Sequence, residues 1–509
     1  MPPSSVIEMG TIPSQDDAVP LEQPLNLPEG TDLLATPQIT PQNPSGQEHE
    51  VRRRQKRFNN ENSNIEEDPL TASEQETFED EDPHAVGLGG DLKSAVAGII
   101  KGMVGPAILY LPHGFATTGY ALAIPIIFIS TTMYLYSSRC LLDAWKSESL
   151  RDYQNTLIAP TGQKRRMLTF PELANRAFGS HGETAVKTGI ALMQSGVCLT
   201  YLIFVPQNLH TSMLYLAGIN LSPRIWLIIM VLIEIPLSWI NDIRKLTCTN
   251  FSANILILYG LLLCLGFSFQ EAIGSSDSTW WVSIWERVAY LEPFRSQWFL
   301  FIGTSVLLFE GSITLLVPLQ ESVLLEEERQ RFPTVYRKVI LSIICFYIFF
   351  GLTCWAAFGD DVHTVLTTSL PSGILATTVQ LAYSLAVLMT YPLQNFPALE
   401  IATRSISSLL IDNAGFRKNS FLTRRNVISS FLVLALAIVA LFTMNSLDKV
   451  VSLMGSLLGC PIAFCVPPLI HTQLCSEGLT TWRRSCNQLV AVAGLVAMVL
   501  ASIETLVTW

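Results

Sequence analysis

Charged residues are scarce in this sequence. They make up 15% of its 509 residues, whereas hydrophobic residues make up 49%. A soluble globular protein carries about 25% charged residues. The shortage therefore argues against a soluble domain and indicates a chain that is mostly surrounded by lipid.

The apolar part of the chain also lacks the alternating segments of about ten residues that are typical of transmembrane β-strands. Instead, apolar runs of about 20 residues recur, and each is long enough to cross a hydrocarbon core of about 30 Å as a helix. We therefore predict an all-α polytopic membrane protein. Its eleven expected spans lie at roughly 92–116, 119–142, 187–211, 224–242, 247–269, 297–319, 336–358, 372–398, 426–444, 449–471 and 486–508.

Cysteine is missing from two loops that we expect to lie on the far side of the membrane, at 212–223 and 270–296. Most of the ten cysteines fall inside predicted spans, where they suit the packing of small apolar side chains. We therefore expect no disulfide framework. Because the sequence shows no metal-ligand spacing, we expect neither a metal site nor an organic cofactor.

Long apolar runs are absent from residues 1–90. These residues carry 18 acidic and 5 basic side chains, a net charge of −13, against −10 for the whole chain. Such a composition buries too little apolar surface to fold. We predict a disordered, acidic, cytosolic tail at 1–90 and a transmembrane domain at 91–509. Within the tail, the segment 29–34 has the form of an acidic dileucine sorting signal, and the basic segment 52–57 is a candidate for binding anionic lipid.

Basic residues near the span ends are unevenly distributed between the two sides of the membrane. One side carries most of them, as in the loop between the second and third spans and in the loop before the last span. The other side holds little more than Arg224, Arg287, Arg295 and Lys449. Loops rich in Lys and Arg stay in the cytosol. The bias therefore predicts a cytosolic N-terminus, and it agrees with eleven crossings.

The first span contains residues that interrupt a helix. Residues 99–114 read "IIKGMVGPAILYLPHG", in which Gly102, Gly105 and Pro106 follow one another closely. Proline removes a backbone donor and clashes with the preceding turn. Backbone groups freed in this way cannot face lipid, so they must line a cavity or pack on protein. This stretch alone fits a broken helix at a binding site and a plain kinked helix equally well.

The sixth span repeats the pattern. Residues 301–320 read "FIGTSVLLFEGSITLLVPLQ", with two glycines, a proline near the end and Glu310 at mid-depth. Spans one and six are five apart. Two repeats of opposite orientation, each opening with a broken helix, are the pattern of the leucine-transporter fold. We therefore predict inverted repeats at roughly 91–270 and 297–471, with the helix at 486–508 as an extra element.

Several motifs occur in an order that resembles the amino acid/auxin permease family. They are "GIIKGMVGPAILYLPHGFATTG" in the first span and, later, "YLIFVPQNL" (201–209), "FEG" (309–311), "YPLQNFPALEI" (391–401) and "VVSLMGSLLGCPIAFCVPPLI" (450–470). The similarity covers residues 90–509 and looks nearest the proton-coupled amino acid transporters and the fungal vacuolar amino acid transporters. It implies a secondary active transporter of a small neutral amino acid that is coupled to protons.

The resemblance also implies where the substrate would bind. Free amides of the broken first span would meet its carboxylate, and carbonyls of the sixth span would hold its amino group. Tyr201 in the third span would close the site, although a packing role fits this residue as well. The expected substrate-binding residues are Gly102, Met103, Val104, Gly105, Tyr201, Phe309, Glu310 and Gly311.

Two glutamates are candidates for the proton carrier. Glu310 is the first, because an ionisable residue at mid-membrane depth is a functional hypothesis by default. A structural role in bracing the broken helix is the alternative for this residue, and Glu234 in the fourth span is the alternative carrier. Animal members of the proton-coupled branch carry a histidine where this chain has Gly98, and we do not transfer that role to His113.

Other assignments stay open. Sodium is the alternative coupling ion, because the eighth span offers side-chain oxygens at Thr377, Thr378, Gln380 and Ser384. An amino acid sensor that signals through the tail to a cytosolic partner is the alternative function. We expect neither an enzyme nor a nucleic-acid partner, since the membrane region shows no catalytic constellation or phosphate loop. The dileucine-like segment favours a vacuolar or lysosomal membrane over the plasma membrane.

Overall fold

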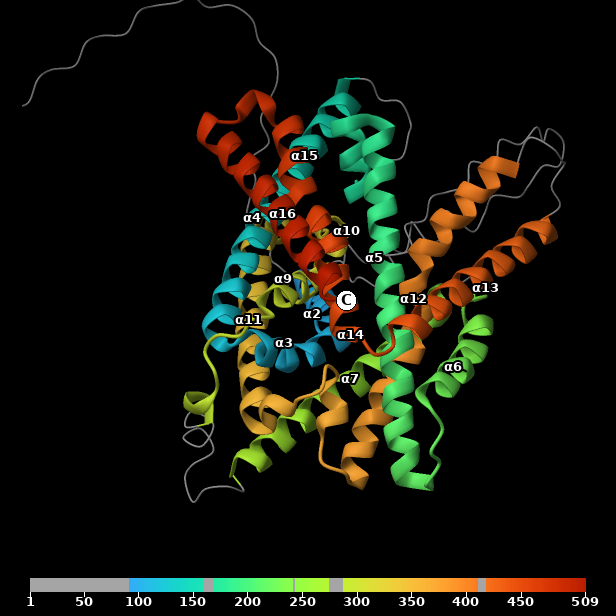
Figure 1. Cartoon of the computed structure of the whole chain (residues 1–509). Coiled ribbons are helices and arrows are strands. Elements are labelled where there is room, and N and C mark those ends of the chain that lie inside the picture. The colour runs from blue at the N-terminus through green and yellow to red at the C-terminus, as the bar shows by residue number, and fades with distance from the viewer. Residues whose placement is uncertain (1–90, 159–167, 241–242, 274–286, 411–417) are drawn as a thin grey trace, which may run out of the picture. The chain divides into compact units, whose positions relative to one another are not determined.

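The computed structural model describes residues 91–158, 168–240, 243–273, 287–410 and 418–509 (Figure 1). Contacts divide the chain into Met1–Glu79 and Asp80–Trp509, and all the described residues belong to the second unit. Every regular element within those ranges is helical. The predicted acidic tail, with its dileucine-like and basic segments, lies outside the described residues.

The helices follow one another along the chain in the order that the apolar runs predict. They are α2 (Leu92–Met103) with η1 (Pro106–Tyr110) and α3 (Leu111–Thr118), α4 (Tyr120–Ile158), α5 (Phe170–Ala217), α6 (Pro223–Leu237), α7 (Ile243–Ile273), α9 (Trp298–Leu307) with α10 (Glu310–Ser322), α11 (Glu326–Phe358), α12 (Ile374–Leu410), α13 (Lys418–Thr443), α14 (Leu447–Leu453) with α15 (Val466–Leu474), and α16 (Thr481–Val507).

The predicted number of eleven spans is not confirmed. Among the described residues, nine helices are long and apolar enough to cross a membrane, and the broken pair at Leu92–Thr118 makes a tenth. The remaining predicted span, at 224–242, corresponds to α6, which has 15 residues. At a rise of 1.5 Å per residue, such a helix is only about 22 Å long. The chain leaves the helix at Ser238, directly after Pro236 and Leu237.

The predicted break in the first span is confirmed. α2 ends at Met103, and the chain bends by 40° before it becomes helical again at Pro106. Val104 (φ −78°, ψ 86°) and Gly105 (φ −128°, ψ −170°) lie between, with non-helical backbone. The proline has no N–H with which to continue the hydrogen-bond ladder of α2, so the helix cannot run on.

The sixth span is interrupted but hardly unwound. Only Leu308 and Phe309 separate α9 from α10, and both keep backbone angles in the helical region. Together α9 and α10 still count as one candidate span, Trp298–Ser322, of 25 residues. The two interrupted spans are therefore unequal, since the first bends sharply and the sixth contains a short turn.

Wide helical turns appear in the tenth span, and the sequence analysis did not predict them. Residues Met454–Gly459 and Pro461–Cys465 form π-helical turns between α14 and α15. Such turns are rare and often occur at functional sites. They lie beside the sixth span, because a Cβ atom on Gly455 would lie 1.8 Å from the carbonyl oxygen of Gly303.

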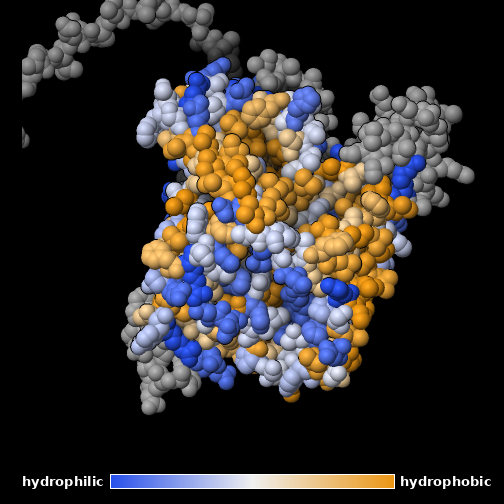
Figure 2. Space-filling view, in the orientation of Figure 1, coloured by the Kyte–Doolittle hydropathy of each residue, from blue (hydrophilic) through white to orange (hydrophobic). Residues whose placement is uncertain are grey.

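Apolar side chains cover the outer faces of the helices that the bundle leaves exposed. Figure 2 shows broad hydrophobic areas over α16 and over the region of α12 and α13. Phe431 and Phe442 on α13 are 72% and 83% exposed, and Leu489 on α16 is 69% exposed. Large apolar side chains in such numbers are stable in contact with lipid, which agrees with a multi-pass membrane protein.

Candidate functional site

The two interrupted spans touch through glycine. A Cβ atom on Gly311 would lie 1.9 Å from the carbonyl oxygen of Gly102, and a Cβ atom on Gly102 would lie 3.2 Å from the carbonyl oxygen of Gly311. A residue with a side chain would keep the two backbones apart, which glycine does not. The contact brings the break of the first span beside the start of α10. Two of the segments expected to bind substrate therefore meet.

The backbone at the first break is partly satisfied by other groups of the protein. The Tyr347 hydroxyl on α11 donates to the Met103 carbonyl at 2.7 Å. The Gly105 N–H donates to the same carbonyl at 2.9 Å, and the Val104 N–H donates to the Ile100 carbonyl at 2.8 Å. Amides that we expected to be free for a carboxylate are thus engaged in this conformation. The turn closed by Gly105 would have to open for a carboxylate to bind there.

Space is left beside Gly105. A Cβ atom on this residue would meet no atom within 4 Å, and its extended backbone is accessible to any residue. On the same broken span, Tyr110 is buried, and its hydroxyl has no hydrogen-bond partner among the described residues. Tyr201 on α5 is also buried, and it lies close enough to Tyr110 and Glu310 to interact with both electrostatically. Two tyrosines therefore lie near the start of α10, and sequence reasoning identified only Tyr201.

Glu310 is the first residue of α10 and is half-buried. The side-chain amide of Gln194 on α5 donates a hydrogen bond to its carboxylate. The N-terminus of a helix carries positive partial charge and favours an anion. Sequence reasoning missed Gln194, although a glutamine inside the apolar run 187–211 was a visible signal. Glu310 thus joins α5 to the start of α10.

A cluster of buried hydroxyls fixes the turn before α10. Tyr134 on α4 lies with its hydroxyl 2.6 Å from the Ser312 Oγ, and it also hydrogen-bonds the hydroxyl of Tyr336 on α11. The Tyr134 ring stacks on Phe309, with ring centroids 4.4 Å apart. Ser312 in turn donates to the Phe309 carbonyl at 3.0 Å. Phe309 is fully buried, so its ring and its carbonyl are held by the protein in this conformation.

The second candidate carrier, Glu234, lies at a different place. Its side chain on α6 is fully buried, and neither carboxylate oxygen has a hydrogen-bond partner among the described residues. Cys198 on α5 lies within electrostatic range of both Glu234 and Glu310. The two glutamates are therefore separate sites that share a neighbouring residue.

The side chains of the eighth span that offer oxygens to a sodium ion also form hydrogen bonds within the protein. Thr377, Thr378 and Ser384 donate their hydroxyls to backbone carbonyls three or four residues earlier in the chain. Gln380 accepts from the Ser212 hydroxyl on α5 at 2.8 Å. Contacts of this kind are typical of polar residues that hold membrane helices together.

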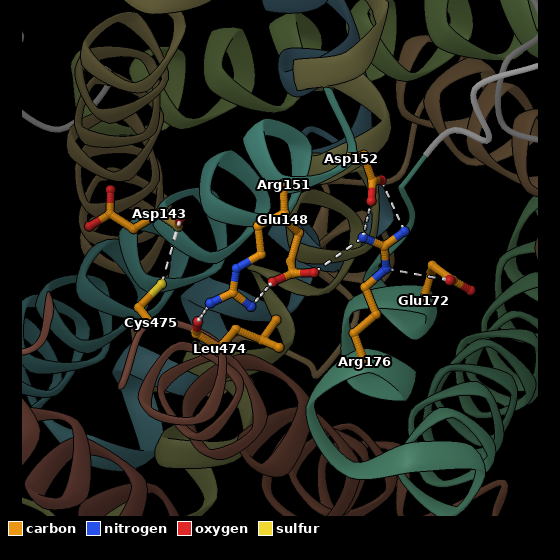
Figure 3. Close-up of polar contacts among 8 residues, drawn as sticks. All are labelled: Asp143, Glu148, Arg151, Asp152, Glu172, Arg176, Leu474 and Cys475. Atoms are coloured by element: carbon orange, nitrogen blue, oxygen red, sulfur yellow. Dashed lines mark hydrogen bonds and ion pairs between the residues drawn. The ribbon is translucent and has the colours of Figure 1, made fainter. Parts of the chain in front are cut away.

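An ion-pair network joins three spans at one end of the bundle (Figure 3). Glu148 on α4 accepts from Arg151 at 2.8 Å and from Arg176 on α5 at 3.2 Å. Arg176 also binds both carboxylate oxygens of Asp152, at 2.8 and 3.0 Å. Arg151 donates to the carbonyl of Leu474, the last residue of α15. The network lies on the side that the charge bias assigns to the cytosol, and it ties α4, α5 and α15 together there.

Comparison with solved structures supports the fold alone. The structure titled "Inward facing conformation of Mhp1" superposes with a TM-score of 0.51 at 15% sequence identity, covering 82% of this chain and 90% of Mhp1. The chain therefore has the leucine-transporter type of fold that the paired broken spans predicted.

Two curated relatives are similar to this chain in sequence. Vacuolar amino acid transporter 3 of Saccharomyces cerevisiae is 30% identical over 427 residues, which cover 82% of this chain and 56% of the relative. Amino acid transporter ANT1 of Arabidopsis thaliana is 26% identical over 440 residues, covering 84% of this chain and 95% of the relative. The chain thus spans about half the length of the yeast relatives that it matches. Both relatives are described as transporters and not as enzymes.

A family model agrees with these relatives. The model described as "Transmembrane amino acid transporter protein" matches residues 89–507, which is nearly the whole of the transmembrane domain. The matched region includes both interrupted spans and their glycine contact. The chain therefore belongs to the transmembrane amino acid transporter family.

Proposed function

We propose that this chain is a secondary active transporter that moves a small neutral amino acid across a membrane, with protons as the coupling ion. The observation that carries the proposal is the backbone contact between Gly102 and Gly311, with Glu310 beside it. Two interrupted helices that meet inside a membrane offer helix ends and backbone groups to a zwitterion. Membership of the family supports the same function.

The substrate carboxylate would bind on the side of the first break. Gly105 leaves space there, and its amide becomes available when its turn with Met103 opens. The ammonium group would lie toward Glu310, and it would reach the Phe309 carbonyl once the hydrogen bond from the Ser312 hydroxyl opens. Tyr110 and Tyr201 would then enclose the substrate side chain, with the unpartnered Tyr110 hydroxyl available for a hydrogen bond. The order of charges follows from the chemistry of the backbone, since amides bind anions and carbonyls bind cations.

Glu310 would carry the coupled proton. It is an ionisable side chain at the interrupted helix, and a neutral donor, Gln194, is its hydrogen-bond partner among the described residues. A carboxyl in that position changes its proton occupancy when the surroundings alternate between open and closed. A pH difference of one unit supplies about 1.4 kcal/mol per proton, or a concentration ratio of about ten. Sodium is the alternative coupling ion, although polar residues like those of the eighth span more often hold membrane helices together than bind an ion.

Reconstitution tests this function directly. The purified chain is placed in liposomes with an imposed pH gradient and offered a panel of labelled amino acids, in sodium-free buffer and then with sodium. We expect at least one neutral amino acid to accumulate about tenfold or more per pH unit without sodium. If no amino acid moves with or without the gradient, the proposal fails. If accumulation requires sodium, the coupling ion is wrong.

The membrane and the orientation are further parts of the proposal. We place the chain in a vacuolar or lysosomal membrane with its N-terminus in the cytosol, supported by the names of the yeast relatives and by the charge bias. Replacing Leu33 and Leu34 by alanine should move a tagged protein toward the cell surface, where microscopy would detect it. An unchanged location would remove the sorting argument.

The long acidic tail favours one alternative, an amino acid sensor that signals to a cytosolic partner. Deletion of residues 1–85 separates the two functions. A transporter keeps its uptake in liposomes after the deletion, whereas a sensor loses signalling while substrate binding persists. Loss of uptake on deletion would show that the tail takes part in transport.

A further inference from the structure

Glu234 is a buried carboxyl without a hydrogen-bond partner in the part of the chain that the structure describes. It lies on α6, three residues before the end of the helix, and its side chain is 0% exposed. Neither oxygen accepts or donates a hydrogen bond among the described residues. An ionised carboxylate is too costly to bury unpaired, so Glu234 is neutral in this conformation. A neutral carboxyl still needs an acceptor for its O–H, so it too is left unsatisfied.

Two side chains one turn apart on α12, a helix that packs against α6, also have no partners among the described residues. Tyr391 lies within electrostatic range of Glu234, and its buried hydroxyl has no partner among the described residues. Asn395 lies one turn further along α12, is 1% exposed, and has no partner on either amide atom. Residues four apart lie on one helix face. Buried polar groups are almost always paired, so a group of three without partners needs an explanation.

Among the residues whose side chains the structure describes, none offers Glu234 a hydrogen bond in this conformation. α6 packs against α5, α12 and α13. α5 contributes Cys198 and α12 contributes Tyr391, both uncharged in their usual state. On α13, Ser429 hydrogen-bonds Ser238 at the end of α6. Arg425, one turn earlier on α13, lies over the ring of Phe396 and interacts electrostatically with Glu400.

From this geometry we infer that Glu234, Tyr391 and Asn395 form a second proton site, distinct from Glu310, which loads and releases one proton in each transport cycle. The inference rests on the proposed function and extends it, because it raises the coupling from one proton to two per amino acid. The site lies between α6 and α12, and it communicates with the substrate site through α5.

The physical basis is a difference between two conformations. In the conformation described, the carboxyl holds its proton because none of the described groups donates a hydrogen bond to it. A shift of α12 along α6 would bring the Tyr391 O–H and the Asn395 side-chain N–H groups to the carboxylate, and hydrogen bonds to the charged form favour proton release. A ligand drives a conformational equilibrium only through a difference in affinity between the states. The unsatisfied groups provide that difference for a proton.

The test is the accumulation ratio in sodium-free liposomes, with the membrane potential clamped at zero. Each coupled proton contributes about tenfold per pH unit. The wild-type chain should reach about a hundredfold per unit, and Glu234→Gln and Glu310→Gln should each reach about tenfold. The double variant should not accumulate substrate at all. The inference is wrong if Glu234→Gln keeps an accumulation ratio of about a hundredfold per pH unit. It is also wrong if the wild-type chain reaches only about tenfold.

Matched variants on α12 guard against a folding defect. Tyr391→Phe and Asn395→Leu remove the donors, so Glu234 keeps its proton and the ratio should fall toward tenfold per pH unit. Tyr383→Phe is the control, because Tyr383 is also a buried tyrosine on α12 whose hydroxyl has no partner among the described residues, but it lies near Cys264 and Cys354. Its ratio should stay at the wild-type value. Equal effects of Tyr391→Phe and Tyr383→Phe would contradict a specific site.

A second readout does not depend on transport. Infrared difference spectra of the wild-type protein, recorded while the conformation is switched by substrate, should show a protonated carboxyl band that is missing in Glu234→Gln and present in Glu310→Gln. A spectrum unchanged by Glu234→Gln would mean that Glu234 does not change its protonation. Absence of any gradient-driven accumulation in the wild-type chain would instead contradict the proposed function.

Discussion

The glycine contact between the first and sixth spans makes a graded prediction. A methyl group on Gly311 would lie 1.9 Å from a backbone oxygen of Gly102, and a backbone atom cannot rotate away. A methyl group on Gly102 would meet the same pair of helices at 3.0 Å or more, with the flexible end of Leu315 as its nearest neighbour. A methyl group on Gly105 would meet nothing within 4 Å. The three alanine variants should therefore differ in a fixed order.

The magnitudes follow from these distances. In Gly311→Ala the two spans must separate by about 1 Å, and overpacking of this kind costs about 1–3 kcal/mol of stability. Displacement of a binding group by about 1 Å can also lower activity by about a hundredfold. Gly102→Ala requires a shift of only a few tenths of an ångström, so its loss should be smaller. Gly105→Ala should leave stability unchanged or raise it by about 0.4–1 kcal/mol.

Thermal unfolding in detergent and substrate exchange in liposomes measure the two effects side by side. We expect Gly311→Ala to lose the most stability and the most exchange, and Gly102→Ala to lose less of both. Gly105→Ala should be at least as stable as the wild-type chain. If the three variants are equally stable, or if Gly105→Ala is the least stable, the reasoning about the contact is wrong.

Three further variants test the surroundings of the site. Gly105→Leu should fold normally, because the space beside the residue is open, but it should abolish uptake because the side chain fills the place of the substrate carboxylate. Uptake at the wild-type rate would mean that the carboxylate does not bind there. Tyr347→Phe removes the hydroxyl donor of the Met103 carbonyl, which keeps the Gly105 N–H, so the free energy of unfolding should fall by about 0.5–1.5 kcal/mol. An unchanged stability in a thermal assay would mean that the bond contributes nothing. Glu148→Gln should weaken the network that holds α4, α5 and α15 together, and the loss should stay at about 1–3 kcal/mol because Arg176 keeps its bonds to Asp152. Proteolysis at that end of the bundle should then become faster, and an unchanged cleavage rate would contradict the prediction.

The sequence was informative where a local rule decides the structure. Gly105 and Pro106 stand side by side, and the proline cannot continue the helix, so the first break could be predicted. The sixth span was less predictable, because its glycines serve contacts between helices. Gly303 meets the backbone of Ser452 and Gly311 meets that of Gly102, so neither unwinds its own helix.

Features that depend on pairs of distant residues were not predictable from one sequence. Gln194 and Glu310 are 116 positions apart, and Tyr347 and Met103 are 244 apart. Local periodicity carries no information about such pairs. The shortness of α6 was also missed, since the apolar run continues past the point where the helix ends at Leu237. Hydropathy counts apolar residues, and it does not register where the backbone leaves the helix.

The central claim is that Glu310 carries a coupled proton at the meeting point of the two interrupted spans. Glu310→Gln keeps the size of the side chain and removes the exchangeable charge, so the accumulation ratio in liposomes is the most direct test. The account predicts that the ratio per pH unit falls by about tenfold, while exchange of labelled for unlabelled amino acid, which needs no net proton movement, persists. A Glu310→Gln protein that accumulates substrate to the wild-type ratio would contradict the account.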